Sequence, residues 1–468
     1  MKVEVISKVC GSGKSTGMIE KIKSDKLLGS DDLYVYITPY ISGCHDIAGT
    51  TAIIGDEYQR PLLDSEGKVI YTPTERNLGN LKFKHPSNRN KFGTKAEGLR
   101  YLMDNNQNIV STHNLFLDIN LDTLDNASQY TLVIDEALDI YDKCNIIPDA
   151  EVKQLLIIGI LYFKDDGITL GFDREKFGDS NNLLLGGDTV RKTYYEPLAN
   201  LCDNSQILIV KGNVLIWEFS SEILKRFKKV YILSYLFEGR EMSTYLKKHN
   251  IEYTVTKGDK GGAYFKDLVD IIQDPKLNSI GDNYFDLSAS QTRVKRKSRV
   301  EPDSDLFEDN EKYLSAKNRY DNYMNGVTDK SISAEKRTDE LRKNLHTVMN
   351  SRWKAKSNDR YFTCISANKK VIAGKNYTLN WLPYSIRATN KYIETSHVAF
   401  LMNIFMQPAI KDACDSGEFK VDEDLVSLSH LVQFIFRSRL RNEEPIKVYV
   451  PSSRMRGLLE DYLKGLYD

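Results

Sequence analysis

The chain has 468 residues, of which 41% are hydrophobic and 28% charged, a composition typical of a folded globular protein rather than a disordered one. Lysine plus arginine and aspartate plus glutamate both total 65, so the formal net charge is zero. Global charge therefore does not indicate a nucleic-acid partner, and any basic surface must be local. The length predicts two or three domains of roughly 100–200 residues each.

Neither a disulfide framework nor a membrane anchor is indicated. The six cysteines form no CxxC pair, which also argues against a zinc ribbon. No apolar run approaches the roughly 20 residues that a membrane helix needs. The strand-like start MKVEVISKV does not have the pattern of a signal peptide. We therefore expect a cytoplasmic protein without a membrane partner.

The first 240 residues alternate short apolar runs with polar or helical segments. The pattern of a buried strand occurs in VEVIS, LYVYIT, NIVST and TLVIDE. Such alternation predicts an α/β fold with a mostly parallel sheet flanked by helices. Residues 151–227 have a mostly helical and irregular pattern, which predicts a helical insertion. VYILSY (230–235) predicts a further strand, and EMSTYLKKH predicts a helix after it.

The second half contains a charged segment. Residues 291–359 include the basic run RVKRKSR (293–299) and an acidic run (301–311), followed by a helix pattern with Leu341, Leu345 and Val348 on one stripe. We expect this segment to be an insertion with partial disorder. The β/α alternation resumes at residue 360 with YFTCIS, YTLNWLPY and IKVYVP. The pattern predicts two α/β lobes, 1–240 and 241–468.

A glycine-rich loop follows the first strand. VCGSGKST (9–16) lies between VEVIS and the helix pattern TGMIEKIK, the strand–loop–helix context of a phosphate-binding loop. Gly11 and Gly13 let backbone amides approach phosphate oxygens, Lys14 would reach the β- and γ-phosphates, and Ser15 would bind Mg²⁺. The predicted ATP contacts are Gly11, Ser12, Gly13, Lys14, Ser15 and Thr16. The full motif has glycine where this chain has Lys8, so a chance glycine-rich turn is the alternative.

Two carboxylates end the apolar strand TLVIDE. Asp135 is predicted to hold Mg²⁺ together with Ser15, and Glu136 to orient and deprotonate the attacking water. The alternative is that the pair caps the N-terminus of a helix, where the helix dipole favours an anion.

Several segments give the chain a resemblance to the superfamily 2 helicases, and specifically to the compact helicase-like ATPases that large bacteriophages encode. The resemblance covers most of the chain and is carried by YITPY (36–40), VSTHNLF (110–116), ILSYLFEG (232–239), RYFTC (360–364), IRATNKY (386–392) and QFIFRSRLR (433–441). In ILSYLFEG only Ser234 matches the family. The resemblance implies two RecA-like lobes, each a mostly parallel sheet flanked by helices, with the charged insertion in the second lobe.

QFIFRSRLR resembles the arginine-finger helix of that family. Gln433 and Arg437 keep the family's spacing of four residues, which would place them on one helix face as catalytic groups that stabilise the transferring phosphoryl group. The second family arginine would fall at Leu440, so either Arg439 or Arg441 would contact ATP instead. FRSR is also similar to the finger of superfamily 1 helicases. The alternative, a basic solvated helix, is disfavoured by the surrounding apolar residues.

The resemblance also implies contacts with one nucleic-acid strand, mainly through its phosphates. The residues expected at this surface are Thr38, Pro39, Thr112, His113, Thr363, Thr389 and Asn390. Taken alone, a residue of this kind is more often an ordinary residue at the end of a strand. No aromatic ladder suited to base stacking is apparent, and the histidines form no metal constellation.

Together the motifs predict a nucleic-acid-dependent ATPase that uses ATP and Mg²⁺ as a helicase or single-strand translocase. Single-stranded or duplex nucleic acid is the expected partner, with DNA favoured over RNA, and proteins of replication, recombination or repair are further partners. A viral member would work in the host cytoplasm. Two alternatives remain open: a packaging terminase ATPase with a nuclease domain, and an ATP-switched nucleic-acid clamp that does not unwind.

Overall fold

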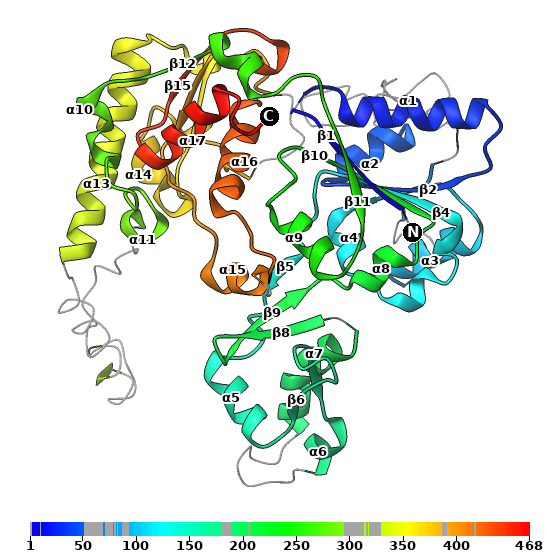
Figure 1. The fold of residues 1–468 in the computed structure, drawn as a ribbon. Coiled ribbons are helices and arrows are strands. Elements are labelled where there is room, and N and C mark those ends of the chain that lie inside the picture. Colours follow the sequence, from blue (N-terminus) through cyan, green and yellow to red (C-terminus); the bar gives the residue numbers. More distant parts are fainter. Residues whose placement is uncertain are drawn as a thin grey trace. The chain divides into compact units, whose positions relative to one another are not determined.

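The computed structural model describes residues 2–9, 11–50, 69–70, 78, 81, 83–86, 93–179, 189–204, 206–293, 313–314, 317, 329–385, 391–415 and 418–468. The chain forms two compact units (Figure 1). Unit 1 consists of Met1–Asp259 and Met406–Val426, and unit 2 of Lys260–Phe405 and Ser427–Asp468. In the described ranges, no helix is long and apolar enough to cross a membrane.

A six-stranded parallel sheet is the centre of unit 1. Its strand order is β11-β1-β10-β4-β2-β3, and every described pairing in it is parallel. The strands are β1 (Lys2–Ser7), β2 (Leu33–Thr38), β3 (Ile109–Thr112), β4 (Tyr130–Asp135), β10 (Lys229–Ser234) and β11 (Tyr253–Lys257). The five strands expected from the sequence in this region are confirmed, and β11 is an additional one. Strand β10 separates the strand of the phosphate loop, β1, from the strand of the acidic pair, β4.

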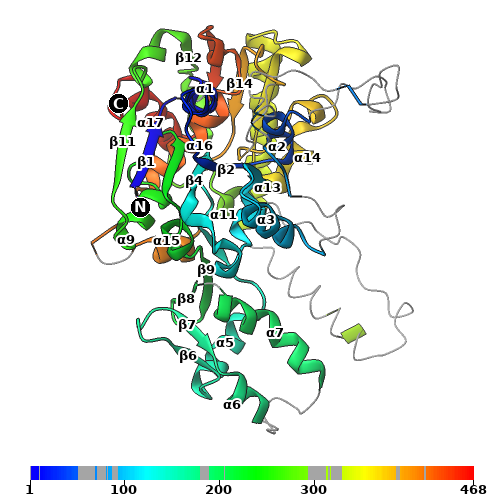
Figure 2. The same ribbon diagram turned by 90° about the vertical axis from the view of Figure 1, so that its right-hand side faces the viewer.

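Helices cover both faces of this sheet, as the continuous apolar strands require. One face packs against α1 (Lys14–Leu27) and α2 (Ile41–Ala48) through a cluster that includes Tyr36 and Val133. The other face includes Leu132 and Ile134 and packs against α3 (Lys95–Asp104), α4 (His113–Leu117), α8 (Ser221–Lys225) and α9 (Glu241–Lys248). Helix α9 was expected from the sequence. Figure 2 shows α1 end-on, above the strands in that view, and α2 obliquely.

Residues 141–218 form an accessory region with its own hydrophobic cluster. It contains a three-stranded antiparallel sheet, β5-β9-β8 (Figure 1), and a two-stranded hairpin, β6-β7 (Figure 2). Its elements are β5 (Tyr141–Lys143), α5 (Asp149–Ile157), β6 (Leu161–Phe163), β7 (Leu170–Phe172), α6 (Arg174–Asp179), α7 (Thr189–Asn204), β8 (Gln206–Val210) and β9 (Val214–Glu218). The expectation of a mostly helical insertion at 151–227 therefore missed four strands, because short runs such as QILIV and VLIWE do not alternate clearly.

A segment from the second half of the sequence completes unit 1. Residues 406–426, with α15 (Pro408–Cys414), contribute Ala413, Cys414, Val421 and Val426 to the main core of the unit. An ion pair of 3.0 Å joins Lys211 to Asp412. Unit 1 thus continues past the expected boundary near residue 240, and it is not continuous in sequence.

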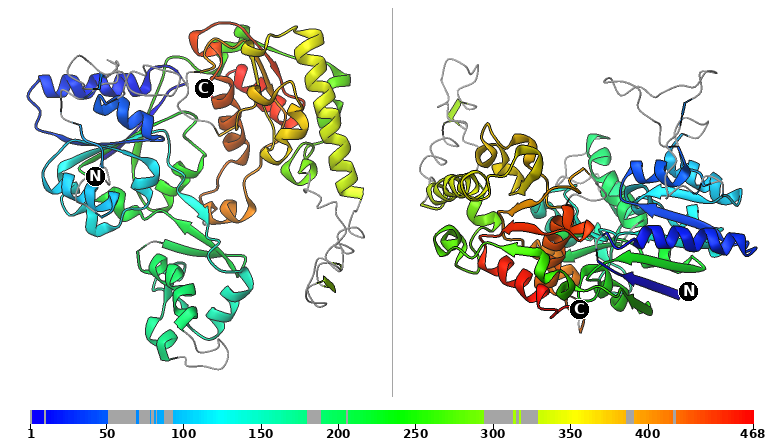
Figure 3. Two further views of the ribbon diagram at one scale, coloured as in Figure 1. Left: turned by 180° about the vertical axis from the view of Figure 1, so that it is seen from behind. Right: turned by 90° about the horizontal axis from the view of Figure 1, so that it is seen from above.

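Unit 2 contains a four-stranded parallel sheet in the order β12-β15-β14-β13. The strands are β12 (Val269–Ile271), β13 (Arg360–Thr363), β14 (His397–Phe400) and β15 (Ile446–Tyr449), and the helices are α10 (Pro275–Asn278), α11 (Ala289–Thr292), α13 (Asp329–His346), α14 (Lys369–Ala373), α17 (Ser453–Leu463) and the last part of α16 (Glu423–Ile435). Helix α13 (yellow in Figures 1 and 3) ends in a π-helical turn, Thr347–Arg352.

The apolar stripe expected on the helix at the end of the charged insertion is confirmed. Leu341, Leu345 and Val348 are buried against Phe362 and Tyr449 of the sheet. Most of the charged runs at 293–311 lie outside the described residues. YTLNWLPY was expected to be a strand, and this is wrong: Thr378–Asn380 form a 3₁₀ turn, and Trp381 makes only an isolated bridge with Phe362.

Candidate nucleotide-binding site

The phosphate loop connects β1 to α1 at the carboxyl edge of the sheet of unit 1. Gly11 (φ 85°) and Gly13 (φ 77°) have left-handed backbone conformations that side chains other than glycine rarely adopt. A Cβ on Gly13 would have no heavy atom within 4 Å, so the space in front of this residue is open. Helix α1 begins directly afterwards, at Lys14. The loop thus has the backbone that lets amides converge on an anion at a helix N-terminus. Cys10 lies outside the described residues.

The Lys14 side chain folds back over the loop. Its ammonium group donates hydrogen bonds to the carbonyl oxygens of Lys8 (2.8 Å) and Val9 (3.1 Å). The Val9 carbonyl also accepts from the Ser12 hydroxyl at 2.8 Å. The cation is therefore held at the loop by neutral acceptors, and a phosphate, whose charge makes it a stronger acceptor, could replace them. Lys8 stands where the full motif has glycine, and its backbone carbonyl is one of the two acceptors of Lys14.

The sheet brings Ser15 and Asp135 together across 120 residues of sequence. The Ser15 hydroxyl donates to Asp135 Oδ1 at 2.7 Å, and the Tyr36 hydroxyl donates to Asp135 Oδ2 at 3.2 Å. The ring nitrogen Nε2 of His113 lies 2.9 Å from the Asp135 carbonyl oxygen. Hydroxyl and carboxylate oxygens are ligands that Mg²⁺ prefers, usually together with phosphate oxygens and water. The pair therefore fits a magnesium ion held largely by a nucleotide.

This fit does not depend on a dedicated metal cage. Within the described part of the chain, no group of three or more His, Cys, Asp or Glu side chains is placed to hold a metal ion. Mg²⁺ is often bound through only one or two protein groups and the substrate phosphates, which is the arrangement that Ser15 and Asp135 offer.

Glu136 has a strained backbone at the same edge. Its φ is 72°, unusual for a residue with a Cβ, and its amide donates to the Leu233 carbonyl oxygen of β10 at 2.9 Å. No helix starts here: residues 136–140 lead directly to β5. The alternative that Asp135 and Glu136 cap a helix is therefore wrong. Strain of this kind is typical of functional sites, where neighbouring structure fixes the residue.

The residues expected to contact a strand in unit 1 are mostly occupied by local structure. Thr38 is buried, and its hydroxyl donates to the Tyr40 carbonyl at 3.0 Å. Thr112 caps α4 by accepting from the Leu115 amide at 3.3 Å, and His113 is buried beside Asp135. Pro39 is half-buried. These placements differ from the expected open surface, because short polar side chains after strands satisfy the backbone of the following turns.

Among the strand contacts expected in unit 2, Thr363 is within the described residues. Thr363 is fully buried at the end of β13, so its hydroxyl does not reach the surface in this structure. Thr389 and Asn390 lie outside the described residues.

The expected finger helix is shorter than predicted. Helix α16 ends at Ile435, so Gln433 lies within it and Arg437 two residues beyond it. Arg437 is buried, and its amide bonds to the Phe434 carbonyl at 3.2 Å, a tightened final turn. Tyr361 of β13 donates to the same carbonyl at 2.9 Å and so covers the helix end. Gln433 and Arg437 therefore do not share a regular helix face, although the burial of Arg437 excludes the solvated basic helix.

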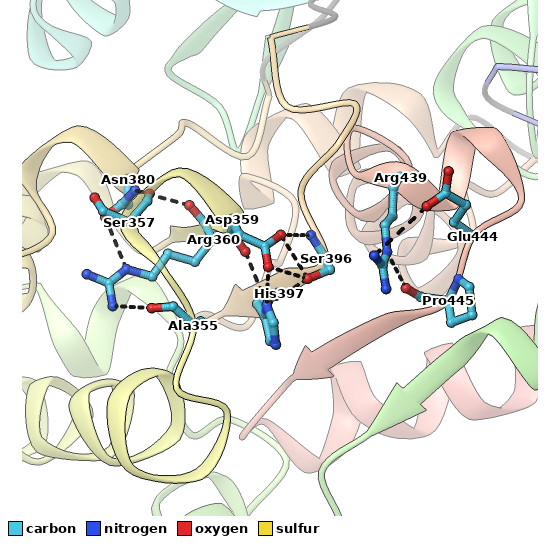
Figure 4. A network of polar contacts seen from close by, with 10 residues as sticks. All are labelled: Ala355, Ser357, Asp359, Arg360, Asn380, Ser396, His397, Arg439, Glu444 and Pro445. Atoms are coloured by element: carbon cyan, nitrogen blue, oxygen red, sulfur yellow. Dashed lines mark hydrogen bonds and ion pairs between the residues drawn. The ribbon is translucent and has the colours of Figure 1, made fainter.

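The two candidate second fingers, Arg439 and Arg441, lie in a short 3₁₀ turn after α16. Arg439 Nε donates to the Pro445 carbonyl at 2.6 Å, and its guanidinium is 3.9 Å from the Glu444 carboxylate (Figure 4). The Arg441 amide donates to the Ser438 carbonyl at 3.1 Å in a 3₁₀ turn, Arg439–Asn442. Leu440 between them is buried. Arg439 is thus already engaged by residues that follow its turn.

A serine, a histidine and an aspartate lie together in unit 2, at the amino edge of its sheet (Figure 4). The Ser396 hydroxyl contacts both Asp359 carboxylate oxygens (2.8 and 2.7 Å) and His397 Nδ1 (2.8 Å), while Nδ1 is 3.2 Å from Asp359 Oδ2. A catalytic triad needs the serine on Nε2 and the aspartate on Nδ1. Here both partners face one nitrogen, so the cluster links the starts of β13 and β14 rather than activating a nucleophile.

A cavity of about 450 Å³ opens at the amino edge of the sheet of unit 1, the edge opposite to the phosphate loop. Its two lysines already have carboxylate partners: Lys21 is 3.0 Å from Asp25, and Lys229 is 3.1 Å from Glu4. The cavity therefore offers little free positive charge for a phosphate, and the phosphate loop is the better candidate for binding one.

Comparison with known proteins supports the fold of the second half. Residues 263–463 match a family model described as the YonV C-terminal Rossmann-like domain, in agreement with the parallel sheet of unit 2. The chain is 27% identical to the SPbeta prophage-derived uncharacterized protein YonV of Bacillus subtilis (strain 168), over 99% of its own length and 99% of the relative's. The chain is thus a mixed α/β protein with a Rossmann-like C-terminal part and a distant relative in a prophage.

Proposed function

We propose that this protein is a nucleic-acid-dependent ATPase that acts as a helicase or single-strand translocase, with DNA favoured over RNA. The observation that carries the proposal is the 2.7 Å contact between the Ser15 hydroxyl and the Asp135 carboxylate, directly beside the phosphate loop. A loop, a hydroxyl and a carboxylate at the carboxyl edge of one parallel sheet are the parts that a magnesium–nucleotide site requires.

The residues of unit 1 would divide the work as follows. The backbone amides from Gly11 to Thr16 would bind the phosphates, and Lys14 would exchange its two carbonyl partners for phosphate oxygens. Ser15 and Asp135 would hold Mg²⁺, which supplies charge neutralisation between the β- and γ-phosphates when bound. Glu136, one residue further on, would orient the attacking water and accept its proton.

The second RecA-like lobe belongs to the same proposal. In this reading, unit 2 supplies Arg437, with Gln433 on the preceding helix, to stabilise charge on the transferring γ-phosphoryl group. The buried guanidinium supports a defined role for Arg437, since burying this charge is costly without one. Closure of two lobes around ATP and opening after hydrolysis would move the protein along a strand.

The strand would be held mainly through its phosphates, so that binding is largely independent of sequence. The net charge of the chain is zero, so this grip needs a local basic surface rather than a general attraction. Affinity should then fall steeply with salt, because released counterions supply much of the binding free energy.

The experiment that tests the proposal is steady-state phosphate release from ATP with Mg²⁺, measured with no nucleic acid and then with single-stranded DNA, duplex DNA and RNA. The proposal requires hydrolysis that a nucleic acid stimulates. Hydrolysis that none of the three nucleic acids stimulates would contradict the dependence on nucleic acid, and strand binding gated by ATP without translocation would favour the clamp.

A further inference from the structure

Three aromatic side chains that are far apart in sequence meet on the surface of unit 2. Tyr284 and Phe285 lie in the loop before α11, and Phe405 follows β14. The ring centroids are 4.9 Å apart for Tyr284 and Phe285, 5.8 Å for Tyr284 and Phe405, and 5.6 Å for Phe285 and Phe405. We call these three residues the aromatic patch. Tyr284 is 50% and Phe285 61% exposed, so the patch faces solvent.

The patch lies at the edge of the sheet where α/β proteins bind ligands. Phe405 follows the carboxyl end of β14 (His397–Phe400), and Arg454 beside it follows that of β15. Tyr284 and Phe285 come after α10, and their ring contacts with Phe405 place them at the same edge. All described strand pairs of this sheet are parallel, so these ends share one edge. Ligands of open parallel sheets bind outside this edge.

A buried arginine supports the patch from the protein side. The Arg454 guanidinium carbon is 4.4 Å from the Phe405 ring centroid and 5.4 Å from that of Tyr284. Its Nη1 donates to Asn403 Oδ1 (2.9 Å) and to the Ile404 carbonyl (2.7 Å), and Nη2 donates to the Ser427 hydroxyl (3.1 Å). The cation is thus fixed within interaction distance of two of the three rings.

The loop that carries Tyr284 and Phe285 is also fixed. Asn403 Nδ2 donates to the Tyr284 carbonyl at 2.8 Å, and the Asn403 amide donates to the Leu287 carbonyl at 3.0 Å. Leu287 is buried with a φ of 63°, and the buried Asp286 is 3.4 Å from Arg337. The backbone that carries the two rings is therefore fixed before any partner binds, which lowers the entropic cost of binding.

We propose that the aromatic patch stacks bases of a single nucleic-acid strand. Solvent-exposed rings beside a fixed arginine match the faces of nucleobases, which stack on aromatic side chains whatever their sequence. This assignment rests on the proposed function and extends it: the phosphate grip would be supplemented in unit 2 by stacking. Stacking would also make the patch bind single strands in preference to duplexes, because the bases of a duplex are not free to stack on a protein.

The test compares binding of oligothymidylate with binding of an abasic deoxyribose-phosphate strand of equal length, by fluorescence anisotropy at fixed salt without nucleotide. The full-length protein should prefer the strand with bases by about 5- to 150-fold, the ratio expected for one stacked base. Phe285→Ala should lose most of this preference, and Phe285→Trp should retain it. Phe285→Leu keeps an apolar side chain, so a loss there identifies the ring itself as the cause.

Leu379→Ala is the matched control, since Leu379 is an apolar residue of unit 2 that is 85% exposed and outside the patch. It should leave the preference unchanged. Equal binding of the two strands by the wild type, or an unchanged preference in Phe285→Ala, would overturn the patch while leaving strand binding intact. Binding of neither strand would overturn the nucleic-acid partner itself, and with it the proposed function. If the patch served a protein partner instead, strand binding would persist, but it would show no preference for bases that depends on Phe285.

Discussion

In the variant Asp135→Asn, Mg²⁺ should no longer strengthen the binding of nucleotide. The carboxylate accepts from Ser15 at 2.7 Å and from Tyr36 at 3.2 Å, and it is 7% exposed. Asparagine keeps the shape but has one oxygen in place of two, so one hydroxyl loses its acceptor. It also lacks the charge that would hold a divalent cation.

The lost hydrogen-bond acceptor and the lost negative charge should have effects of different size. A buried hydrogen bond to a charged group is worth about 1.5–3 kcal/mol, and the relief from burying a charge offsets part of its loss. We expect the free energy of unfolding without ligand to fall by only about 1–2 kcal/mol. A ligand at a hundred times its dissociation constant stabilises the folded state by about 2.7 kcal/mol. The share of this stabilisation that depends on Mg²⁺ should disappear in the variant.

The assay is thermal unfolding with a non-hydrolysable ATP analogue, with and without Mg²⁺. In the wild type, Mg²⁺ should raise the midpoint further than the analogue alone, and in Asp135→Asn this increment should be absent. Asp139→Asn is the control, because Asp139 is an exposed aspartate four residues further on. An increment of the same size in Asp135→Asn and in the wild type would refute the assignment of Asp135 to the metal.

Three further substitutions test the proposed general base, the proposed arginine finger and a buried ion pair. Glu136→Gln should keep ATP binding and stop hydrolysis, leaving a complex with raised affinity for a strand in a filter-binding assay; loss of ATP binding in step with turnover would mean a structural role. Arg437→Ala should lower kcat by orders of magnitude, on the scale of ~10³, with little change in ATP affinity; an unchanged kcat excludes a finger. Glu218→Gln should lower the free energy of unfolding in urea by about 3 kcal/mol, because the buried Glu218 carboxylate lies 2.6 Å from Lys248 and 3.0 Å from His249. Burial alone would raise the pKa of Glu218, but His249 and Lys248 outweigh it and hold the pKa below its usual 4.5. The stabilisation is therefore present above about pH 4.5 and is lost as the pH falls through the lowered pKa, a loss that Glu218→Gln should not show.

Truncation is a poor substitute for these variants. A fragment that ends near residue 285 keeps the phosphate loop and the acidic pair, but it lacks 406–426. That segment supplies Cys414, Val421 and Val426 to the core of unit 1. Inactivity of such a fragment would reflect an incomplete core as readily as a missing second lobe, so point variants in the full chain are the sharper test.

The parts of the site that the sequence predicts are those with local signals. The loop from Gly11 to Ser15 has a fixed spacing of glycines, lysine and hydroxyl, and Asp135 and Glu136 directly follow an apolar run long enough to be a buried strand. Parallel strands then bring both motifs to one edge, as the 2.7 Å contact between Ser15 and Asp135 shows. The role of Tyr36 at Asp135 has no such signal, because a tyrosine within LYVYIT has the pattern of an ordinary core residue.

Features that depend on tertiary contacts could not be predicted from the sequence. The return of 406–426 to unit 1 depends on packing between segments about 200 residues apart, such as the pair of Lys211 and Asp412. The end of α16 before Arg437 is stabilised by Tyr361, more than 70 residues earlier. The aromatic patch likewise brings together Tyr284 and Phe405, which are too far apart in sequence to form a recognisable pattern of aromatic residues.

ATP hydrolysis at the phosphate loop is tested most directly by the rate of phosphate release from ATP in Lys14→Ala and in the wild type, with Mg²⁺ and single-stranded DNA present. The Lys14 ammonium, now held by the carbonyls of Lys8 and Val9, is the charge that should meet the β- and γ-phosphates. We expect hydrolysis by the wild type and none above background by Lys14→Ala, with strongly weakened ATP binding. Turnover in Lys14→Ala equal to that of the wild type would contradict it.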